Sequence, residues 1–230
     1  MTIVPFGGLR PTPGPTHPII DYLLELAGKP RAKVCFVPTA TGDSAETLLA
    51  MYQRFPAARA ERTHLELFHR TVEDVRSLLL AQDIVYVAGG NTVNLLAIWR
   101  AHGVHEAMRT AWENGVILTG GSAGSLCWYE SGTTDSFDLY ALKPLHDGLG
   151  FLPGSHCPHY DGEPQRRPLY QSLIASGFPP GIAIDDDAAV RYEGTEIAEV
   201  VSARAGATAY HVEKNGDAAR ETPLEARLLA

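Results

Sequence analysis

DIVYVAGGNTVNLLAIWRAHG (residues 83–103) decides the fold class of this chain. The stretch begins as a short apolar run, passes through two glycines, and continues with apolar residues at helical spacing. Such a run predicts a buried strand, and the glycines permit the tight turn that joins the strand to a helix. Units of this kind are typical of parallel sheets whose two faces are both covered by helices.

The strand–turn–helix pattern extends through the first half of the chain. Strand-like runs are predicted at residues 33–38, 64–68, 83–90 and 115–121. Helical spacing is found at residues 18–28, 44–55, 71–82 and 92–103, with Gly28 as a candidate helix end. The alternation predicts an α/β protein with a mostly parallel sheet flanked by helices on both faces.

The last part of the chain has a different pattern. Short β-like pieces at 188–194, 197–206 and 208–216 follow one another with glycine turns and no helix between them. They predict a C-terminal antiparallel β extension of the same sheet, so we expect a single domain over residues 1–230. Residues 133–158 show no clear period and predict a long structured loop, a kind of segment that is often functional.

Composition narrows the class of protein. The 230 residues carry a net charge of -8, which argues against a nucleic-acid surface because phosphate binding needs a basic face. Neither a signal peptide nor an apolar run long enough for a bilayer is visible, so no membrane partner is expected. Cys35, Cys127 and Cys157 form no paired motif. We therefore expect a reduced, cytoplasmic protein.

A second glycine turn carries a candidate nucleophile. VILTGGSAGSLCWYE (residues 116–130) contains G-x-S-x-G centred on Ser122, between a predicted strand and a predicted helix. In such a turn the serine hydroxyl is lifted out of the backbone, and the N–H of Ala123 could donate to an oxyanion. Gly90 in the first turn could supply the second donor. The alternatives are a plain glycine-rich strand end and a phosphate-binding loop, although the lysine-containing phosphate signature is missing.

A serine nucleophile needs a base, and the segment GSHCPHYDGE (residues 154–163) offers two histidines. Position alone does not separate His156 from His159. We prefer His159 because Pro158 restricts the backbone before it and two acids follow it. An α/β-hydrolase order, in which the acid precedes the histidine, would instead require His211.

Four ordered motifs resemble the peptidase E and cyanophycinase family of serine peptidases. They are AGGNTVNLLAIWRAHG, LTGGSAGSLCWYESGTTDS, GSHCPHYDGEPQRR and GIAIDDDAAV, and the similarity covers nearly the whole chain. The resemblance implies an α/β fold related to class I glutamine amidotransferases. It also implies hydrolysis of dipeptides that begin with aspartate, or of β-aspartyl-arginine polymers in the cyanophycinase branch.

Carried over residue by residue, the resemblance makes Ser122 the nucleophile and His159 the base, with oxyanion donors from Gly90 and Ala123. Three acids compete for the third catalytic position, and we rank Asp135 first, then Asp186, then Asp161. An arginine after the histidine is expected to select the acidic side chain of the substrate. The sequence offers Arg166 and Arg167 for this role, and we favour Arg166, since a guanidinium binds a carboxylate through two parallel hydrogen bonds.

The predicted function is hydrolysis of Asp-X dipeptides through a Ser-His-Asp acyl-enzyme, with a short acidic peptide as partner. Three alternatives stay open: a cyanophycinase-like exopeptidase, a catalytically inactive binding homologue, and glutamine amidotransferase chemistry. The last would need a cysteine at the position of Ser122, and Cys127 five residues later is expected to pack in the core instead. No cofactor and no metal is predicted, and an exposed strand of the C-terminal extension is a candidate for pairing in a homodimer.

Overall fold

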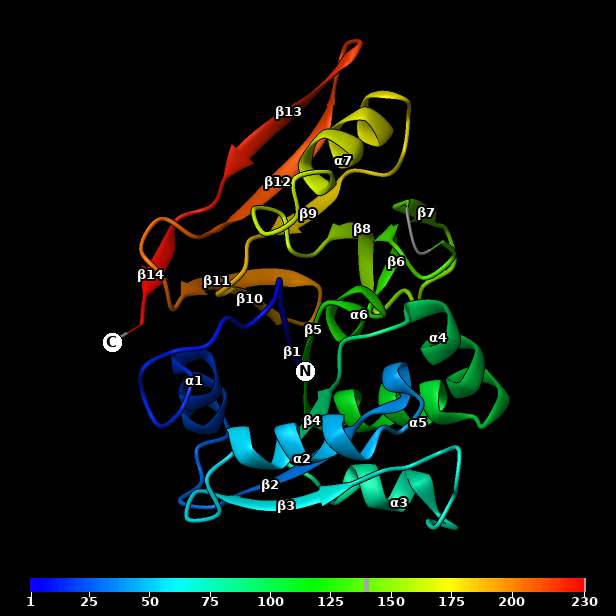
Figure 1. The fold of residues 1–230 in the computed structure, drawn as a ribbon, viewed down its shortest axis with the longest axis vertical. Coiled ribbons are helices and arrows are strands. Elements are labelled where there is room, and N and C mark those ends of the chain that lie inside the picture. The colour runs from blue at the N-terminus through cyan, green and yellow to red at the C-terminus, as the bar shows by residue number, and fades with distance from the viewer. Residues whose placement is uncertain (139–140, 230) are drawn as a thin grey trace.

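Two β-sheets with helices packed around them organise the computed structural model, which describes residues 1–138 and 141–229 (Figure 1). The helices are α1 Pro18–Leu26, α2 Ala45–Arg54, α3 Val75–Leu80, α4 Thr92–Ala101, α5 Val104–Glu113, α6 Ala123–Leu126 and α7 Arg166–Ala175, with the short 3₁₀ helix η1 Thr39–Thr41. The first sheet has the order β14-β11-β10-β1-β5-β4-β2-β3 and the second β13-β12-β9-β8-β6-β7.

The strands have the following bounds. Those of the first sheet are β1 Thr2–Phe6, β2 Ala32–Val37, β3 Ala60–His64, β4 Ile84–Val87, β5 Ile117–Gly121, β10 Ala188–Glu193, β11 Glu196–Ser202 and β14 Ala226–Leu228. Those of the second are β6 Tyr129–Thr134, β7 Lys143–Leu145, β8 Leu152–Cys157, β9 Gly181–Ile184, β12 Ala209–Asn215 and β13 Ala218–Pro223.

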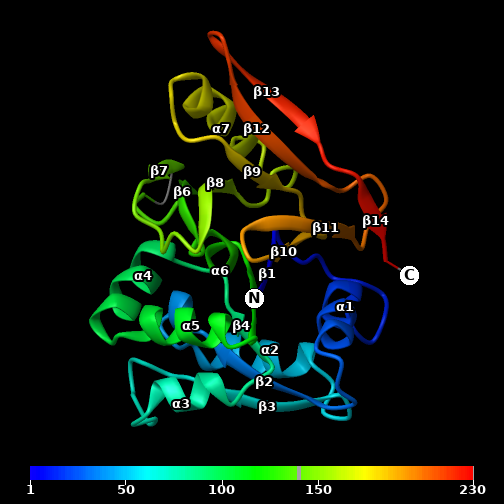
Figure 2. The ribbon, with the colours of Figure 1, turned by 180° about the vertical axis from the view of Figure 1, so that it is seen from behind.

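The centre of the first sheet is parallel, as the alternating pattern predicts. Strands β1, β5, β4, β2 and β3 all run in one direction, and β10 joins β1 in the antiparallel sense. Side chains of α1 and α2 pack with one face of this sheet, and those of α3, α4 and α5 pack with the other. The view from behind shows the same layering (Figure 2). Helices on both faces leave the carboxyl edge of the parallel strands as the place for a ligand.

Several element boundaries differ from the prediction. The predicted strand at 64–68 begins four residues earlier, at Ala60, because this edge strand is partly exposed and carries charged side chains that hide its pattern. The predicted loop at 133–158 contains the end of β6, β7 and all of β8. Strand β1 was not predicted at all; its sequence is only five residues long and contains Pro5.

The C-terminal extension does not belong to one sheet. Strands β10, β11 and β14 extend the first sheet, whereas β12 pairs with β9, β13 pairs with β12, and both extend the second. The fold is therefore mixed α/β with two sheets, and the expectation of a single mostly parallel sheet with an appended meander is corrected. Among the described residues, no helix combines the length and the apolar character needed to cross a membrane.

Candidate active site

A pocket of about 500 Å³ opens at the carboxyl edge of the parallel strands. The ends of β1, β4 and β5 form its floor, one face of α2 lines it, and Ser122 and His159 both border it. Three strand ends meet here because neighbouring parallel strands finish at the same edge of the sheet. The pocket therefore lies at the strand ends where the sequence predicted the catalytic residues.

Ser122 occupies a strained turn at the end of β5. Its backbone angles are φ 55° and ψ -118°, a region that residues with a side chain rarely adopt. Its N–H donates to the carbonyl of Gly7 at 3.3 Å, and its own carbonyl accepts from Leu126 at 2.9 Å. The turn also needs Gly124, where a Cβ would lie 2.3 Å from the carbonyl oxygen of Val87. These hydrogen bonds and the close packing at Gly124 thus hold the serine in its unusual conformation.

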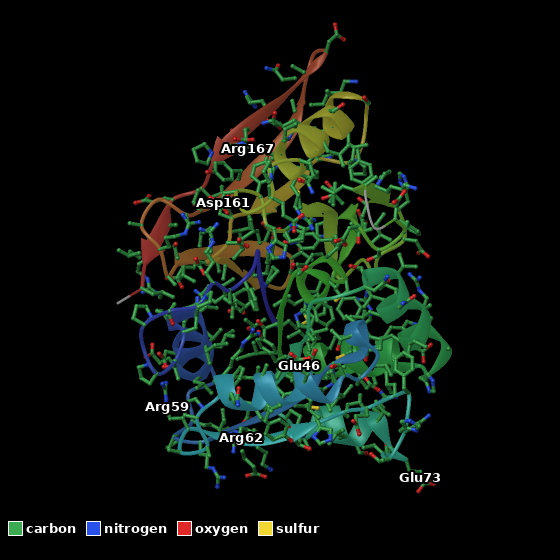
Figure 3. The ribbon with its side chains drawn as sticks, viewed as in Figure 1. Glu46, Arg59, Arg62, Glu73, Asp161 and Arg167 are labelled. Atoms are coloured by element: carbon green, nitrogen blue, oxygen red, sulfur yellow. The ribbon has the colours of Figure 1, made fainter. Side chains whose placement is uncertain are left out.

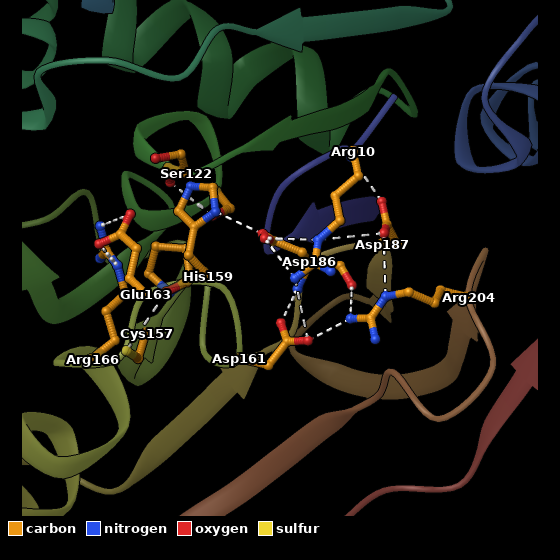
Figure 4. Close-up of polar contacts among 12 residues, drawn as sticks. Arg10, Ser122, Cys157, His159, Asp161, Glu163, Arg166, Asp186, Asp187 and Arg204 are labelled. Carbon is orange, nitrogen blue, oxygen red and sulfur yellow. Dashed lines mark hydrogen bonds and ion pairs between the residues drawn. The ribbon is translucent and has the colours of Figure 1, made fainter. Parts of the chain in front are cut away.

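His159 lies beside Ser122, with Asp186 on its other side (Figure 4). The imidazole Nδ1 is 2.7 Å from Oδ1 of Asp186, so Nδ1–H donates to the carboxylate and Nε2 keeps its lone pair. His159 has φ 53°, a second left-handed residue in the site. A Cβ on Gly8 would lie 2.5 Å from Cε1 of His159, so only glycine fits between the end of β1 and the imidazole. Strained backbone positions cluster at functional sites, and two of them meet here.

Asp186 is held by several donors. Arg10 approaches its Oδ2 with Nε and Nη2, each at 3.4 Å, and Asp161 accepts the backbone N–H of Asp186 at 2.8 Å. Burial raises the pKa of Asp186, but the hydrogen bond from His159 and the positive charge of Arg10 outweigh it, and the net pKa is lowered. The carboxylate therefore stays ionised and can stabilise a positive charge on His159.

The structure pairs His159 with Asp186, the second-ranked acid, and among the described residues it shows no contact between His159 and the first-ranked Asp135. Asp135 is exposed in the turn after β6, and its backbone carbonyl accepts from the N–H of Asp138. The second sheet carries Asp135 away, whereas Asp186 follows β9 where the chain passes from the second sheet to the first. Asp161, the third-ranked acid, contacts the backbone of Asp186 and the guanidinium of Arg204.

The two predicted oxyanion donors are placed differently. Ala123 directly follows Ser122 as the first residue of α6. Gly90 has φ 137°, and its α-carbon packs against Ala40, where a Cβ would lie 2.5 Å from the carbonyl oxygen. The residue that lines the pocket is Gly89, where a Cβ would lie 3.7 Å from Oγ of Ser122. The N–H of Gly90 belongs to the peptide that joins it to Gly89, so it stays a candidate donor.

Neither predicted specificity arginine lines the pocket. The guanidinium of Arg166 is buried and binds Glu163 twice, with Nε–Oε2 at 2.7 Å and Nη2–Oε1 at 3.2 Å. Arg167 pairs with Glu221 and stacks on the rings of Tyr160 and Tyr210, at the β12–β13 hairpin. Arg167 therefore fastens the hairpin to α7, outside the lining of the pocket, and Arg166 is engaged by a neighbouring carboxylate.

The rival groups lie in the core. His156 is fully buried between the carbonyl of Ile182 (2.7 Å from Nδ1) and the hydroxyl of Ser125 (2.9 Å from Nε2). Burial lowers its pKa to about 3, so it is neutral. Cys127 is buried as well, and burial raises the pKa of its thiol well above the ordinary value. It packs in the core, as predicted, and is no thiolate nucleophile.

Sequence reasoning missed the contributions of β1 and α2. Gly7 and Gly8 follow the apolar run of β1, so they form a third strand-end glycine pair. That repetition of the pattern was the available signal. Glu46 and Arg54 of α2 also line the pocket. Their sequence context is an ordinary amphipathic helix, which gives no sign that its polar positions face a site.

Asp185, beside the catalytic candidates, leads to a prediction about stability. It is 2% exposed, its Oδ2 accepts from the N–H of Thr208, and its buried Oδ1 has no partner among the described residues. Burial raises its pKa to about 6. The folded state therefore binds the carboxyl proton of Asp185 more tightly than the unfolded state does. The protonated carboxyl contributes its full share to the free energy of unfolding below about pH 4, and this contribution is lost as the pH rises through 6.

Asp185→Asn should mimic the protonated carboxyl and raise stability at pH 7.5 by about 1–2 kcal/mol, or by a few degrees in Tm. At pH 4 the variant and the parent should unfold at the same temperature. Thermal unfolding at both pH values measures the effect. A variant that is no more stable than the parent at pH 7.5 would contradict the prediction.

Comparisons with known proteins show the family to which the chain belongs. The model of peptidase family S51 matches residues 7–200. The uncharacterized peptidase YgaJ of Bacillus subtilis is 40% identical over 230 residues, covering 99% of this chain and 98% of that protein. Peptidase E of Shewanella denitrificans is 28% identical over 134 residues, covering 54% and 57%. A crystal structure of a peptidase from an acI-B1 Actinobacterium has a TM-score of 0.68 at 18% identity, covering 98% of this chain and 94% of that one, and so shares the fold. The chain thus belongs to peptidase family S51.

Proposed function

We propose that the protein is a serine peptidase that hydrolyses short peptides with an N-terminal aspartate. The observation that carries the proposal is the 2.7 Å hydrogen bond between His159 and Asp186 beside the strained Ser122. In this arrangement Nε2 of His159 takes the proton of the Ser122 hydroxyl as the oxygen attacks the peptide carbonyl.

The tetrahedral intermediate needs donors for its negative oxygen. The N–H groups of Ala123 and Gly90 are the candidates, and a donor of this kind is worth about 3 kcal/mol in comparable sites. His159 then passes its proton to the leaving amine. In the second half of the reaction His159 takes a proton from the attacking water and returns it to the Ser122 oxygen as the acid product leaves. Asp186 keeps the imidazole oriented and stabilises its positive charge throughout.

The preference for aspartate rests on Arg166. Its guanidinium is buried outside the lining of the pocket, and the side chain of its partner Glu163 is 36% exposed. The proposal therefore requires Glu163 to leave the guanidinium when the substrate binds. A substrate carboxylate of the same charge can replace Glu163 on the guanidinium and form the same two hydrogen bonds. The resemblance to peptidase E and the relative of that name support the same substrate class.

A panel of peptides tests the proposal. Asp-Leu should be cleaved, with kcat/KM at least about tenfold above that of Glu-Leu or Leu-Leu, since Leu cannot form the two charge-assisted hydrogen bonds to Arg166 and Glu places its carboxylate one methylene further out. A fluorophosphonate should label Ser122. Cleavage of β-aspartyl-arginine in place of Asp-Leu would favour the cyanophycinase alternative, and absence of both labelling and cleavage would favour the inactive binding homologue.

A further inference from the structure

One face of helix α2 forms a charged wall of the catalytic pocket. Glu46, Ala50 and Arg54 all line the pocket, and residues four positions apart share one face of a helix. Eight helical positions separate the two charged residues, a rise of about 12 Å. The wall thus presents a carboxylate at one end and a guanidinium at the other. Figure 3 shows Glu46 near the middle of the molecule, whereas Glu73 lies at its periphery.

Arg54 has hydrogen-bonding capacity to spare. Its Nη1 donates to the hydroxyl of Tyr86 at 3.3 Å, which leaves most of its five N–H groups for other acceptors. Within residues 1–138 and 141–229, no carboxylate lies within ion-pair distance of Arg54. By contrast, Arg10 is shared among Asp161, Asp186 and Asp187.

Neighbouring contacts fix which end of the wall lies nearer the base. Leu9 lines the pocket together with Arg54 and directly follows Gly8, which abuts the His159 ring. Arg54 and Leu9 also line the adjoining depression together. The Glu46 end follows η1, where Thr41 packs against Gly90. The guanidinium therefore lies toward the histidine, and the carboxylate lies toward the candidate oxyanion donor.

This polarity matches the two halves of a peptide undergoing acyl transfer. The leaving amine must lie near the histidine that protonates it, and the acyl half lies toward the oxyanion donors. We propose that Arg54 binds the free C-terminal carboxylate of the leaving residue, and that Glu46 binds the free N-terminal ammonium. The inference rests on the proposed function and restricts its substrates to peptides of two or three residues with both ends unblocked, since each extended residue spans about 3.5 Å.

Both charges also suit the dipole of α2, because an acid in the first turn and a base in the last turn stabilise a helix. That effect alone does not require the charges to face a pocket. It predicts a change in stability of up to about 1 kcal/mol and no change in selectivity between free and blocked peptides. Kinetic discrimination between such peptides therefore separates the two roles.

The experiment compares Asp-Leu with its C-terminal amide and with its N-acetyl derivative, in the parent and in Arg54→Gln and Glu46→Gln. The parent should show a KM for Asp-Leu that is about 10- to 100-fold lower than for either blocked peptide, as expected for one charge-assisted pair at each end. Arg54→Gln should raise the KM for Asp-Leu until it equals that for the amide. Glu46→Gln should do the same relative to the acetylated peptide, and kcat should change by less than about threefold in each case.

Arg76→Gln and Glu73→Gln are matched controls. Arg76 lies in α3 and Glu73 lies just before it, and both are exposed on the opposite face of the first sheet. Both should keep the parental selectivity. Equal KM values for Asp-Leu and its amide in the parent, or an equal rise for both in Arg54→Gln, would overturn the inference while the proposed peptidase stands. If the parent cleaves none of the three peptides, the proposed function is overturned and the inference falls with it.

Discussion

Ser122→Ala is expected to lower kcat for Asp-Leu by about 10³- to 10⁶-fold, because the attacking oxygen is lost while the binding groups remain. The variant should also lose fluorophosphonate labelling. Its unfolding temperature should equal that of the parent, because alanine keeps the same backbone strain at φ 55° and ψ -118°. Stopped assays of Asp-Leu cleavage and thermal unfolding provide the two measurements.

Ser122→Gly separates the strain from the chemistry. Glycine reaches this backbone region at no steric cost, so the variant should be as inactive as Ser122→Ala yet more stable than the parent by about 1 kcal/mol. Ser176→Ala is a control on an exposed serine at the end of α7 and should change neither property. Substantial turnover by Ser122→Ala would refute the nucleophile, and a glycine variant less stable than the parent would refute the stored strain.

Local patterns account for the part of the site that the sequence predicted. A strand that ends in glycines before a helix is a feature of consecutive residues, so the turns at Gly89 and Ser122 are visible without tertiary information. Parallel strands then bring both turns to one edge of the sheet. The segment around His159 is rich in turn residues, which is also a feature of consecutive residues and is visible in the sequence alone.

The partner of the histidine could not be predicted in this way. His159 and Asp186 are 27 residues apart, and they meet only because the chain crosses from the second sheet to the first after β9. The sequence does not predict where the chain after β9 meets His159. Asp135 is also an acidic residue in a turn, so nothing local favours Asp186 over it. Arg167 illustrates the same limit, because its partner Glu221 lies 54 residues away on a hairpin.

Asp186→Asn is the prediction with the second largest effect, a fall in kcat/KM of about 10³- to 10⁴-fold. An asparagine offers a single carbonyl oxygen, and both Nδ1–H of His159 and the guanidinium of Arg10 require an acceptor at this side chain. If the carbonyl turns to Arg10, the amide NH₂ faces His159 and favours the tautomer with its proton on Nε2. The base would then have no lone pair toward Ser122, and the charge that stabilises the imidazolium would also be gone.

Asp135→Asn is the matched control and should alter kcat/KM by less than about threefold, since its exposed side chain lies away from the histidine. Because the pKa of Asp186 is lowered in the folded protein, its carboxylate is ionised across pH 5–8. Titration of Asp186 itself should therefore add no step to the pH profile of the parent over that range. A large loss in Asp135→Asn with a mild one in Asp186→Asn would return the third catalytic position to Asp135, and the hydrogen bond seen between His159 and Asp186 would then serve only to hold the loop.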